Sequence, residues 1–149
     1  MKALVSHGPA QPFSLEIVDD PEPSPGEAVA KVLACGAGLT VQHVKAGRTP
    51  IPFPRIMGHE IAAEIVEING DCGNLTVGMP VTAYFYLTCG HCKWCLINRQ
   101  TLCKNFGGYI GRACDGGYAE YIKLPAKNFV PIPETLDIYS KPAEIGVIC

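Results

Sequence analysis

Four cysteines lie close together in the stretch CGHCKWCLINRQTLC, and they are Cys89, Cys92, Cys95 and Cys103. Their spacing, C-x2-C-x2-C-x7-C, lets three thiolates surround one side of an ion while a short helical turn returns the fourth. Four thiolates around zinc leave no position for water or substrate, so such a site holds a loop and does not catalyse. Sets of four cysteines also hold iron–sulfur clusters, but this spacing differs from both ferredoxin patterns. We therefore predict one structural zinc in a lobe at about residues 86–106.

The bulk composition favours a small-molecule function over a nucleic-acid or membrane partner. The 149 residues suit one domain, and the net charge is only −2 with 17% charged residues. The start MKALVSHGPA has no apolar stretch of signal-peptide length, and no long apolar run follows, so we expect a cytoplasmic chain. In a reducing compartment, clustered cysteines more often bind metal or react than form disulfides.

Short apolar runs rich in Val, Ile and Tyr alternate with turn residues such as PEPSPG and NGDCGN. These runs are KALVSH, FSLEIVD, EAVAKVLACG, EIAAEIVEING, MPVTAYFY, GGYAEYIKLP and NFVPIP. They predict a mostly β domain whose strands close into a barrel or sandwich. Helical signals are few: residues 40–46, a turn after Met57, residues 96–104 and a segment from Ser140.

Three further motifs accompany the cysteines: GHE at 58–60, VGMPVTA at 77–83 and DGGYAEY at 115–121. In order and spacing the chain resembles, over essentially all 149 residues, the N-terminal catalytic domain of the zinc-dependent medium-chain alcohol dehydrogenases. The resemblance implies a GroES-like, partly open β-barrel over residues 1–149, with short helices and the four-cysteine lobe. In that family a Rossmann domain follows and binds NAD(H) or NADP(H) through a Gly-rich loop. We find no G-x-G-x-x-G after a strand, so we expect this domain to be absent from the chain and the isolated chain to be inactive.

Family members hold a second, catalytic zinc with a Cys, the His of GHE and a later Cys, Asp or Glu. That zinc polarises the alcohol and stabilises the alkoxide. The resemblance assigns His59 to this site, with Glu60 beside it and Cys149 near the third position. The first ligand usually lies in A-C-G-x-C-x-[TS]-D-x-H, but this chain reads ACGAGLTVQH, so Gly38 replaces the cysteine and Val41 the aspartate. We therefore predict a degenerate catalytic zinc site.

Thr40 and His43 match the family positions that pass the alcohol proton through a hydroxyl and the cofactor ribose to an imidazole near solvent. The alternative is that Thr40 caps a short helix and His43 is a surface histidine. Cys35, three residues before the vacant ligand position, is interpreted as a buried small hydrophobe, with a substitute metal ligand as the alternative.

The leading hypothesis is the catalytic-domain portion of an NAD(P)-dependent, zinc-containing alcohol dehydrogenase-like oxidoreductase that interconverts an alcohol and a carbonyl. One alternative keeps the fold but lacks the catalytic zinc and acts on a conjugated or thioester-activated substrate. Another is a non-catalytic, zinc-stabilised binding module. The resemblance also implies a homo-oligomer for the full-length parent.

Overall fold

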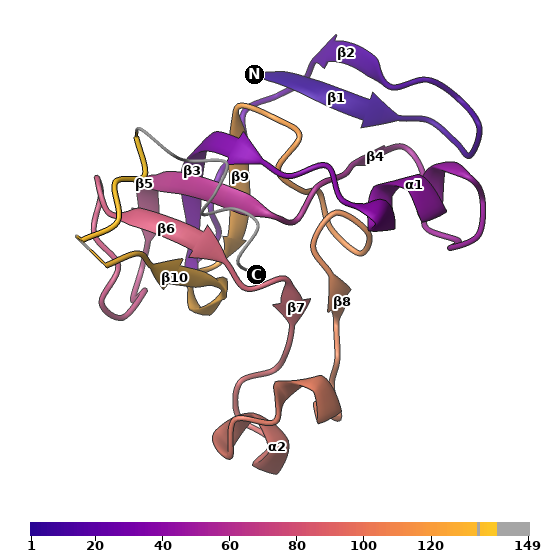
Figure 1. The fold of residues 1–149 in the computed structure, drawn as a ribbon. Helices are drawn as coiled ribbons and strands as arrows, with labels where there is room; N and C mark the ends of the chain where they lie inside the picture. Colours follow the sequence, from indigo (N-terminus) through magenta and orange to yellow (C-terminus); the bar gives the residue numbers. More distant parts are fainter. Residues whose placement is uncertain (134, 140–149) are drawn as a thin grey trace.

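The computed structural model describes residues 1–133 and 135–139. Its elements (Figure 1) follow in the order β1 (Lys2–Ser6), β2 (Ser14–Ile17), β3 (Glu27–Cys35), α1 (Leu39–Lys45), β4 (Arg55–Ile56), β5 (Ile61–Asn69), β6 (Pro80–Ala83), β7 (Tyr86–Leu87), α2 (Lys93–Leu96), η1 (Gln100–Leu102), β8 (Gly108–Tyr109), β9 (Tyr121–Pro125), η2 (Ala126–Asn128) and β10 (Phe129–Pro131). Most are short strands that coincide with the apolar runs of the sequence, which confirms the mostly β fold.

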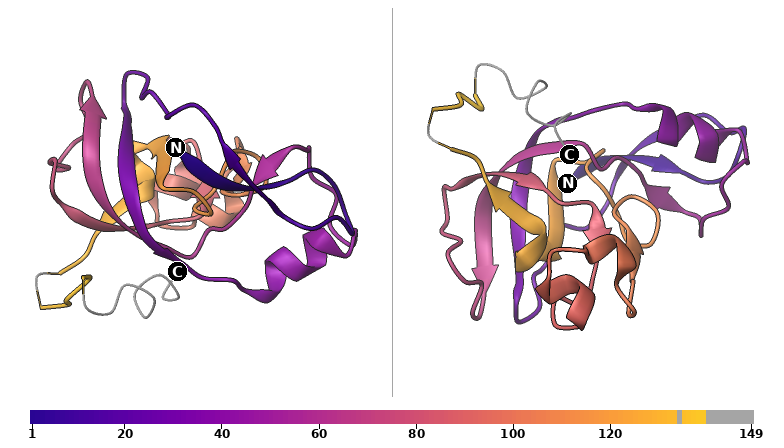
Figure 2. Two further views of the ribbon diagram at one scale, coloured as in Figure 1. Left: turned by 90° about the horizontal axis from the view of Figure 1, so that it is seen from above. Right: turned by 60° about the horizontal axis from the view of Figure 1, so that its bottom comes forward.

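Antiparallel strands form one large and one small sheet. The large sheet has the order β10-β6-β5-β3-β9 and the small one the order β2-β1-β4. The amide of Leu4 donates to the carbonyl of Tyr118 at 2.8 Å, and that of Glu120 to Lys2 at 3.1 Å, so β1 also runs beside the segment that leads into β9. The sheets are thereby joined along one edge. In both views of Figure 2, α1 and the far end of the small sheet lie to one side of the large sheet.

Strand β5 is covered on both faces, which anchors the residues just before it. Ile61, Ala63 and Ile65 are fully buried in the main core. Ala62, which points to the opposite face, is also fully buried and packs against Ile132. Because alternate residues of a strand point to opposite faces, this pattern requires apolar neighbours on both sides. The GHE motif therefore enters a strand that has little freedom to shift.

The helices agree only in part with the sequence-based prediction. Helix α1 confirms the turn expected at residues 40–46, and the expected helix at 96–104 is present as two shorter pieces, α2 and η1. The turn predicted after Met57 is wrong, because residues 58–60 have no helical structure and lead directly into β5. The segment from Ser140 lies outside the described residues. In the described part of the chain, no helix is long and apolar enough to cross a bilayer.

A second loop, residues 115–118, holds the GHE motif in its extended path. Three main-chain hydrogen bonds of 2.8–2.9 Å join the loops: from Gly116 to Ile56, from Gly117 to Gly58 and from Tyr118 to Met57. Gly58 has φ +92°, a left-handed backbone conformation that residues other than glycine rarely adopt. A Cβ on Gly116 would overlap the carbonyl oxygen of Gly58 and lie 2.7 Å from that of Met57. These contacts replace the helical turn expected there.

The lobe projects from the body on two short strands. β7 and β8 pair as a two-stranded ribbon, with Tyr86 opposite Tyr109 and Leu87 opposite Gly108. The lobe lies at the end of this ribbon, away from both sheets (Figure 1). The side chain of Lys127, in η2, donates to the carbonyl of Thr88 at the base of the lobe. The lobe boundaries at about residues 86–106 stay a prediction.

We predict that Gly116→Ala destabilises the 149-residue chain because its methyl group would overlap a backbone oxygen. Overpacking of this kind costs about 3 kcal/mol of unfolding free energy. Gly73→Ala is the matched control: its φ is +63°, but an added Cβ has nothing within 4 Å. The unfolding free energy of that control should fall only by the cost of the left-handed backbone, about 1–2 kcal/mol. Urea unfolding measures both, and equal losses would contradict the proposed close contact of the two loops.

Candidate active site and four-cysteine centre

The lobe brings its four cysteine sulfurs together. All four Sγ atoms lie within 4.8 Å of one another. The Sγ atoms of Cys89 and Cys103 lie 3.5 Å apart and those of Cys92 and Cys95 3.6 Å apart, and the pairs Cys89–Cys95 and Cys92–Cys103 are separated by 4.0 Å. Sulfurs placed tetrahedrally about 2.3 Å from one ion are about 3.8 Å apart, so these separations fit a single four-coordinate ion. They are far too long for disulfides, and all four cysteines are free.

Main-chain amides at the centre favour thiolates, the form that binds metal. Hydrogen bonds from the backbone of Cys95, and then of Lys104, lower the pKa of Cys92 to about 6. A hydrogen bond from the backbone of His91 likewise lowers the pKa of Cys89. Burial raises the pKa of Cys95 to about 11, so this thiol would release its proton on binding a metal.

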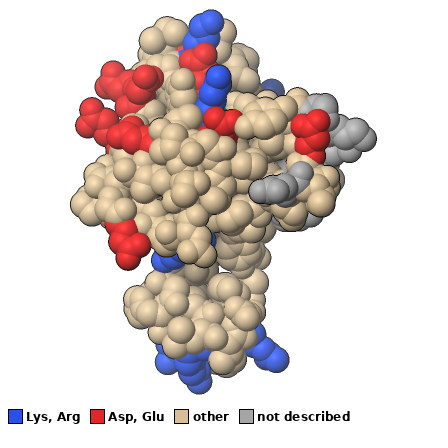
Figure 3. All heavy atoms as spheres, turned by 90° about the vertical axis from the view of Figure 1, so that its left-hand side faces the viewer, with Lys and Arg blue, Asp and Glu red and all other residues tan. Residues whose placement is uncertain are grey.

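Basic residues surround the centre. Residues 72–114 contain no Asp or Glu, whereas the lobe carries Lys93, Arg99 and Lys104. Figure 3 shows basic side chains at the tip of the lobe and acidic side chains over the main body. A dication leaves two of the four thiolate charges unbalanced, and these cations offset the remainder.

A second constellation lies in the body, where Thr40 and His59 share a small pocket. The pocket has a volume of about 250 Å³. The described residues that line it are Thr40, His59, Phe85, Tyr86, Tyr109 and Arg112. Helix α1 supplies the threonine, the GHE loop the histidine, and the segments before and within the β7–β8 ribbon the aromatic rings. The ring of Phe85 lies against the imidazole of His59, with centroids 5.2 Å apart.

The surroundings of His59 favour a neutral imidazole. Burial lowers the pKa of His59; the carboxylate of Glu60 opposes this shift, and the cation of Arg112 adds to it. A neutral imidazole can accept a hydrogen bond or bind a metal. The arrangement therefore presents a hydroxyl and an uncharged imidazole to one pocket that is walled by aromatic rings and Arg112.

Glu60 fills the space that a side chain at position 38 would occupy. A Cβ on Gly38 would lie 2.5 Å from the Oε1 atom of Glu60, and one on Gly36 would overlap Oε2. The amide of Gly36 also donates to the main-chain carbonyl of Glu60 at 2.8 Å, which fixes the two segments together. The carboxylate thus lies against the turn between β3 and α1.

Comparisons with known proteins decide the family. A profile described as "Alcohol dehydrogenase GroES-like domain" matches residues 24–134. The chain belongs to this family. An alcohol dehydrogenase from Geobacillus stearothermophilus is 37% identical, over 99% of this chain and 43% of the relative.

Solved structures agree with the family. A cobalt- and zinc-bound thermostable alcohol dehydrogenase from Pyrobaculum aerophilum has a TM-score of 0.85 and 34% identity, over 95% of this chain and 44% of that one. An alcohol dehydrogenase from E. coli CFT073 in complex with NADH has a TM-score of 0.82 and 32% identity, over 92% of this chain and 40% of that one. The chain spans about two fifths of the length of these relatives.

The GroES-like domain departs from the zinc-ligand pattern described above at two positions that the structure now explains. Gly38 has no side chain, and Glu60 occupies its place. Val41 is buried against Val44 and Met57 and contributes packing instead of a carboxylate. Among the described residues, the lobe is the only place where three or more His, Cys, Asp or Glu side chains come within metal-binding distance of one another. Cys149, the predicted third ligand, lies outside the described residues.

Thr40 and His43 lie three residues apart on α1, which places them on neighbouring turns of one helix face. Thr40 lines the pocket, whereas His43 is exposed and its Nδ1 lies 3.3 Å from Nη1 of Arg48. No side-chain cap bond begins the helix, because the N-cap residue is Gly38. The structure therefore gives Thr40 no capping role, and its part in a proton relay stays a prediction.

Cys35 packs into the main core, as expected of a small hydrophobe. Burial raises the pKa of its thiol to about 12, so the thiol is protonated at neutral pH. Metal binding requires the thiolate, so this environment disfavours the substitute-ligand alternative.

Sequence analysis missed the aromatic wall of the pocket and Arg112. The run YFY at residues 84–86 is the signal that could have indicated the wall. No local pattern indicates Arg112, because the turn after β8 brings it to the pocket.

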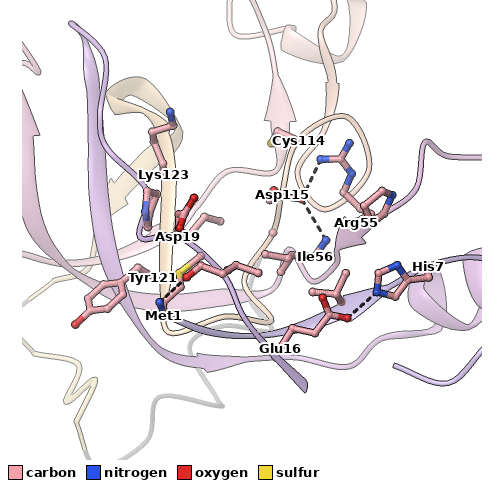
Figure 4. Close-up of a pocket in the computed structure, with 16 residues that line it drawn as sticks. Met1, His7, Glu16, Asp19, Arg55, Ile56, Cys114, Asp115, Tyr121 and Lys123 are labelled. Carbon is pink, nitrogen blue, oxygen red and sulfur yellow. Dashed lines mark hydrogen bonds and ion pairs between the residues drawn. The ribbon is translucent and has the colours of Figure 1, made fainter. Parts of the chain in front are cut away.

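A larger hollow of about 560 Å³ lies elsewhere, between the small sheet and β9 (Figure 4). It contains an ion pair between Arg55 and Asp115, at 2.9 Å, and a contact between His7 and Glu16 at 2.6 Å. None of the residues predicted to be catalytic or metal-binding lines it. The candidate site is therefore the smaller pocket at Thr40 and His59.

We predict that Cys35 resists alkylation in the folded chain. With a pKa of about 12, against about 8.5 for a free thiol, it should react about a thousandfold more slowly than an exposed cysteine near pH 7.5. Mass-spectrometric iodoacetamide kinetics, with the chain unfolded in urea as the reference, measure this ratio. Fast labelling of Cys35 in the folded chain would show an accessible thiolate and revive its role as a metal ligand.

Proposed function

We propose that this chain is the catalytic-domain portion of an NAD(P)-dependent oxidoreductase that interconverts an alcohol and a carbonyl. The observation that carries the proposal is the pocket in which the hydroxyl of Thr40 and the imidazole of His59 meet beside aromatic rings. Membership of the alcohol dehydrogenase GroES-like family supports it. So do the relatives solved with zinc and with NADH.

In the proposed reaction the nicotinamide, when bound, accepts a hydride from the alcohol carbon. The residues of this chain handle the proton that leaves the alcohol oxygen. Thr40 would accept that proton as it passes its own hydroxyl proton on, and the imidazole of the exposed His43, on the same helix face, would take up the proton passed on and release one to solvent. Phe85 and Tyr86 exclude water from one side of the pocket.

The lobe is proposed to hold one structural zinc. The sulfur separations fit a single tetrahedral ion, and a closed four-thiolate shell cannot bind substrate. The zinc would cross-link the short elements α2 and η1, whose few residues bury little apolar surface of their own. Its role is to stabilise the lobe.

The position beside His59 fits a catalytic zinc less well than the lobe fits a structural zinc. A missing thiolate removes a negative charge opposite a dication, and Val41 cannot orient a metal-bound histidine as an aspartate would. This observation favours a second candidate function, hydride transfer without catalytic zinc to or from a conjugated or thioester-activated substrate. The homo-oligomeric state stays a prediction.

We expect the purified 149-residue chain to retain about one zinc after dialysis, because within residues 1–133 and 135–139 only the lobe brings four cysteine sulfurs together. Cys89→Ser should release this zinc and expose the lobe to protease. His59→Ala should leave the zinc content unchanged. Elemental analysis decides the matter: two zinc ions per chain, the second lost in His59→Ala, would show a rebuilt catalytic metal site.

Thr40→Val keeps the β-branched shape but removes the hydroxyl. We expect this change, made in the full-length enzyme, to lower kcat by about 10²–10⁴-fold. Thr40→Ser should restore much of the rate, and Thr76→Ala at an exposed position should change nothing. The assay follows NAD⁺ or NADP⁺ reduction with a panel of alcohols. A natural polypeptide that reduces neither cofactor with any alcohol would instead favour a binding module.

A further inference from the structure

Arg112 is a half-buried cation in the candidate pocket with no protein acceptor among the described residues. It lies in the turn after β8, and its main-chain amide donates to Tyr109 at 3.1 Å. Its guanidinium takes part in none of the ion pairs or side-chain hydrogen bonds that the described residues form. Its nitrogens are not among the buried side-chain atoms that lack a partner, so its N–H groups remain open to water or to an acceptor that enters the pocket.

The nearest acid in sequence is already occupied. Asp115, three residues after Arg112, accepts from the guanidinium of Arg55 at 2.9 Å and from the amide of Ile56 at 3.1 Å. Both partners belong to the β4 side of the loop, beside the larger hollow (Figure 4). Asp115 therefore serves the loop contact that holds the GHE motif and leaves Arg112 without an acid.

Glu60 does not take this place either. Its carboxylate lies against Gly36 and Gly38, and Glu60 is not among the residues that line the pocket. Arg112 is thus the only permanently charged side chain among the described lining residues. A ligand that enters the pocket therefore meets the guanidinium of Arg112 at the wall, whereas the carboxylate of Glu60 acts on His59 from behind it.

The position of the guanidinium suits an oxyanion. Its central carbon lies 5.1 Å from the centroid of the Tyr109 ring, a cation–π arrangement. The N–H groups of a guanidinium lie in its plane and form parallel pairs that match a carboxylate or a phosphate. The ring contact and the tight turn restrict the side chain, so less conformational entropy is lost on binding.

We propose that Arg112 binds an oxyanion, a carboxylate or a phosphate, on the substrate whose alcohol or carbonyl group lies at Thr40. That the bound anion is part of a substrate rests on the function proposed above, whereas the anion site itself does not depend on that function. The pocket has a volume of about 250 Å³ on this chain, which holds the oxyanion end of a ligand such as a hydroxy acid or a phosphorylated alcohol.

The test measures binding to the 149-residue chain without cofactor or turnover. The probes are lactate, glycerol 3-phosphate and propane-1,2-diol, the last a neutral analogue of lactate. Calorimetry gives affinities, and the Nε–Hε resonance of Arg112 reports contact in NMR spectra. We expect one or both anions to bind at least about tenfold more tightly than the diol, since a charge-assisted hydrogen bond is lost with the diol. Which anion binds better identifies the oxyanion.

Three variants separate charge from fold. Arg112→Gln should weaken anion binding about tenfold or more and leave the diol unchanged, and Arg112→Lys, which keeps the charge but not the paired N–H groups, should lie between. Lys31→Gln, at an exposed position of β3, removes one positive charge away from the pocket and should match the unmodified chain. Equal affinity for lactate and diol, no binding of either anion, or unchanged anion binding in Arg112→Gln overturns the proposal. If the unmodified chain binds the anions but the full-length protein oxidises no alcohol, the anion site is supported and the proposed function is wrong.

Discussion

The close approach of two glycine-containing loops is the constraint on which the candidate site depends. Main-chain hydrogen bonds fasten residues 56–58 to residues 116–118, and the backbones approach where a Cβ on Gly116 would overlap a carbonyl oxygen. This contact fixes the chain path into β5, whose two buried faces prevent it from sliding. His59 and Glu60 lie between these two anchors. Their positions are therefore set by backbone geometry more than by side-chain interactions.

The four-cysteine centre depends on different physics. Its ligands all lie within one lobe at the end of the β7–β8 ribbon, and the lobe joins the body through few contacts, such as that of Lys127 with Thr88. Local hydrogen bonds lower the pKa of Cys92, and local cations offset the thiolates. The same ribbon carries Tyr86 and Tyr109 of the pocket, and Phe106 of the lobe packs against both rings. Metal binding that orders the lobe therefore also supports the aromatic wall of the pocket.

The pocket differs from the zinc-ligand pattern of its family at several positions that lie close together. Gly38 makes room that the carboxylate of Glu60 fills, and Val41 joins the apolar cluster with Met57. The loss of a thiolate and an aspartate removes negative charge near His59, while Arg112 adds positive charge to the same pocket. Glu60 keeps a carboxylate behind His59, so the positive charge that an entering ligand meets comes from Arg112 at the pocket wall.

Sequence alone determined the features that depend on local spacing. The four cysteines lie within fifteen residues, so their convergence required only short turns, and the strands followed from runs of Val, Ile and Tyr. The helical turn expected after Met57 failed because a contact with residues nearly sixty positions away overrode local preference. Tertiary structure alone decided that Glu60 fills the space at Gly38, that Asp115 pairs with Arg55, and that Arg112 lines the pocket with no acidic partner in the described part of the chain. Those outcomes depend on which segments the fold brings together across long loops, and residue spacing carries no such information.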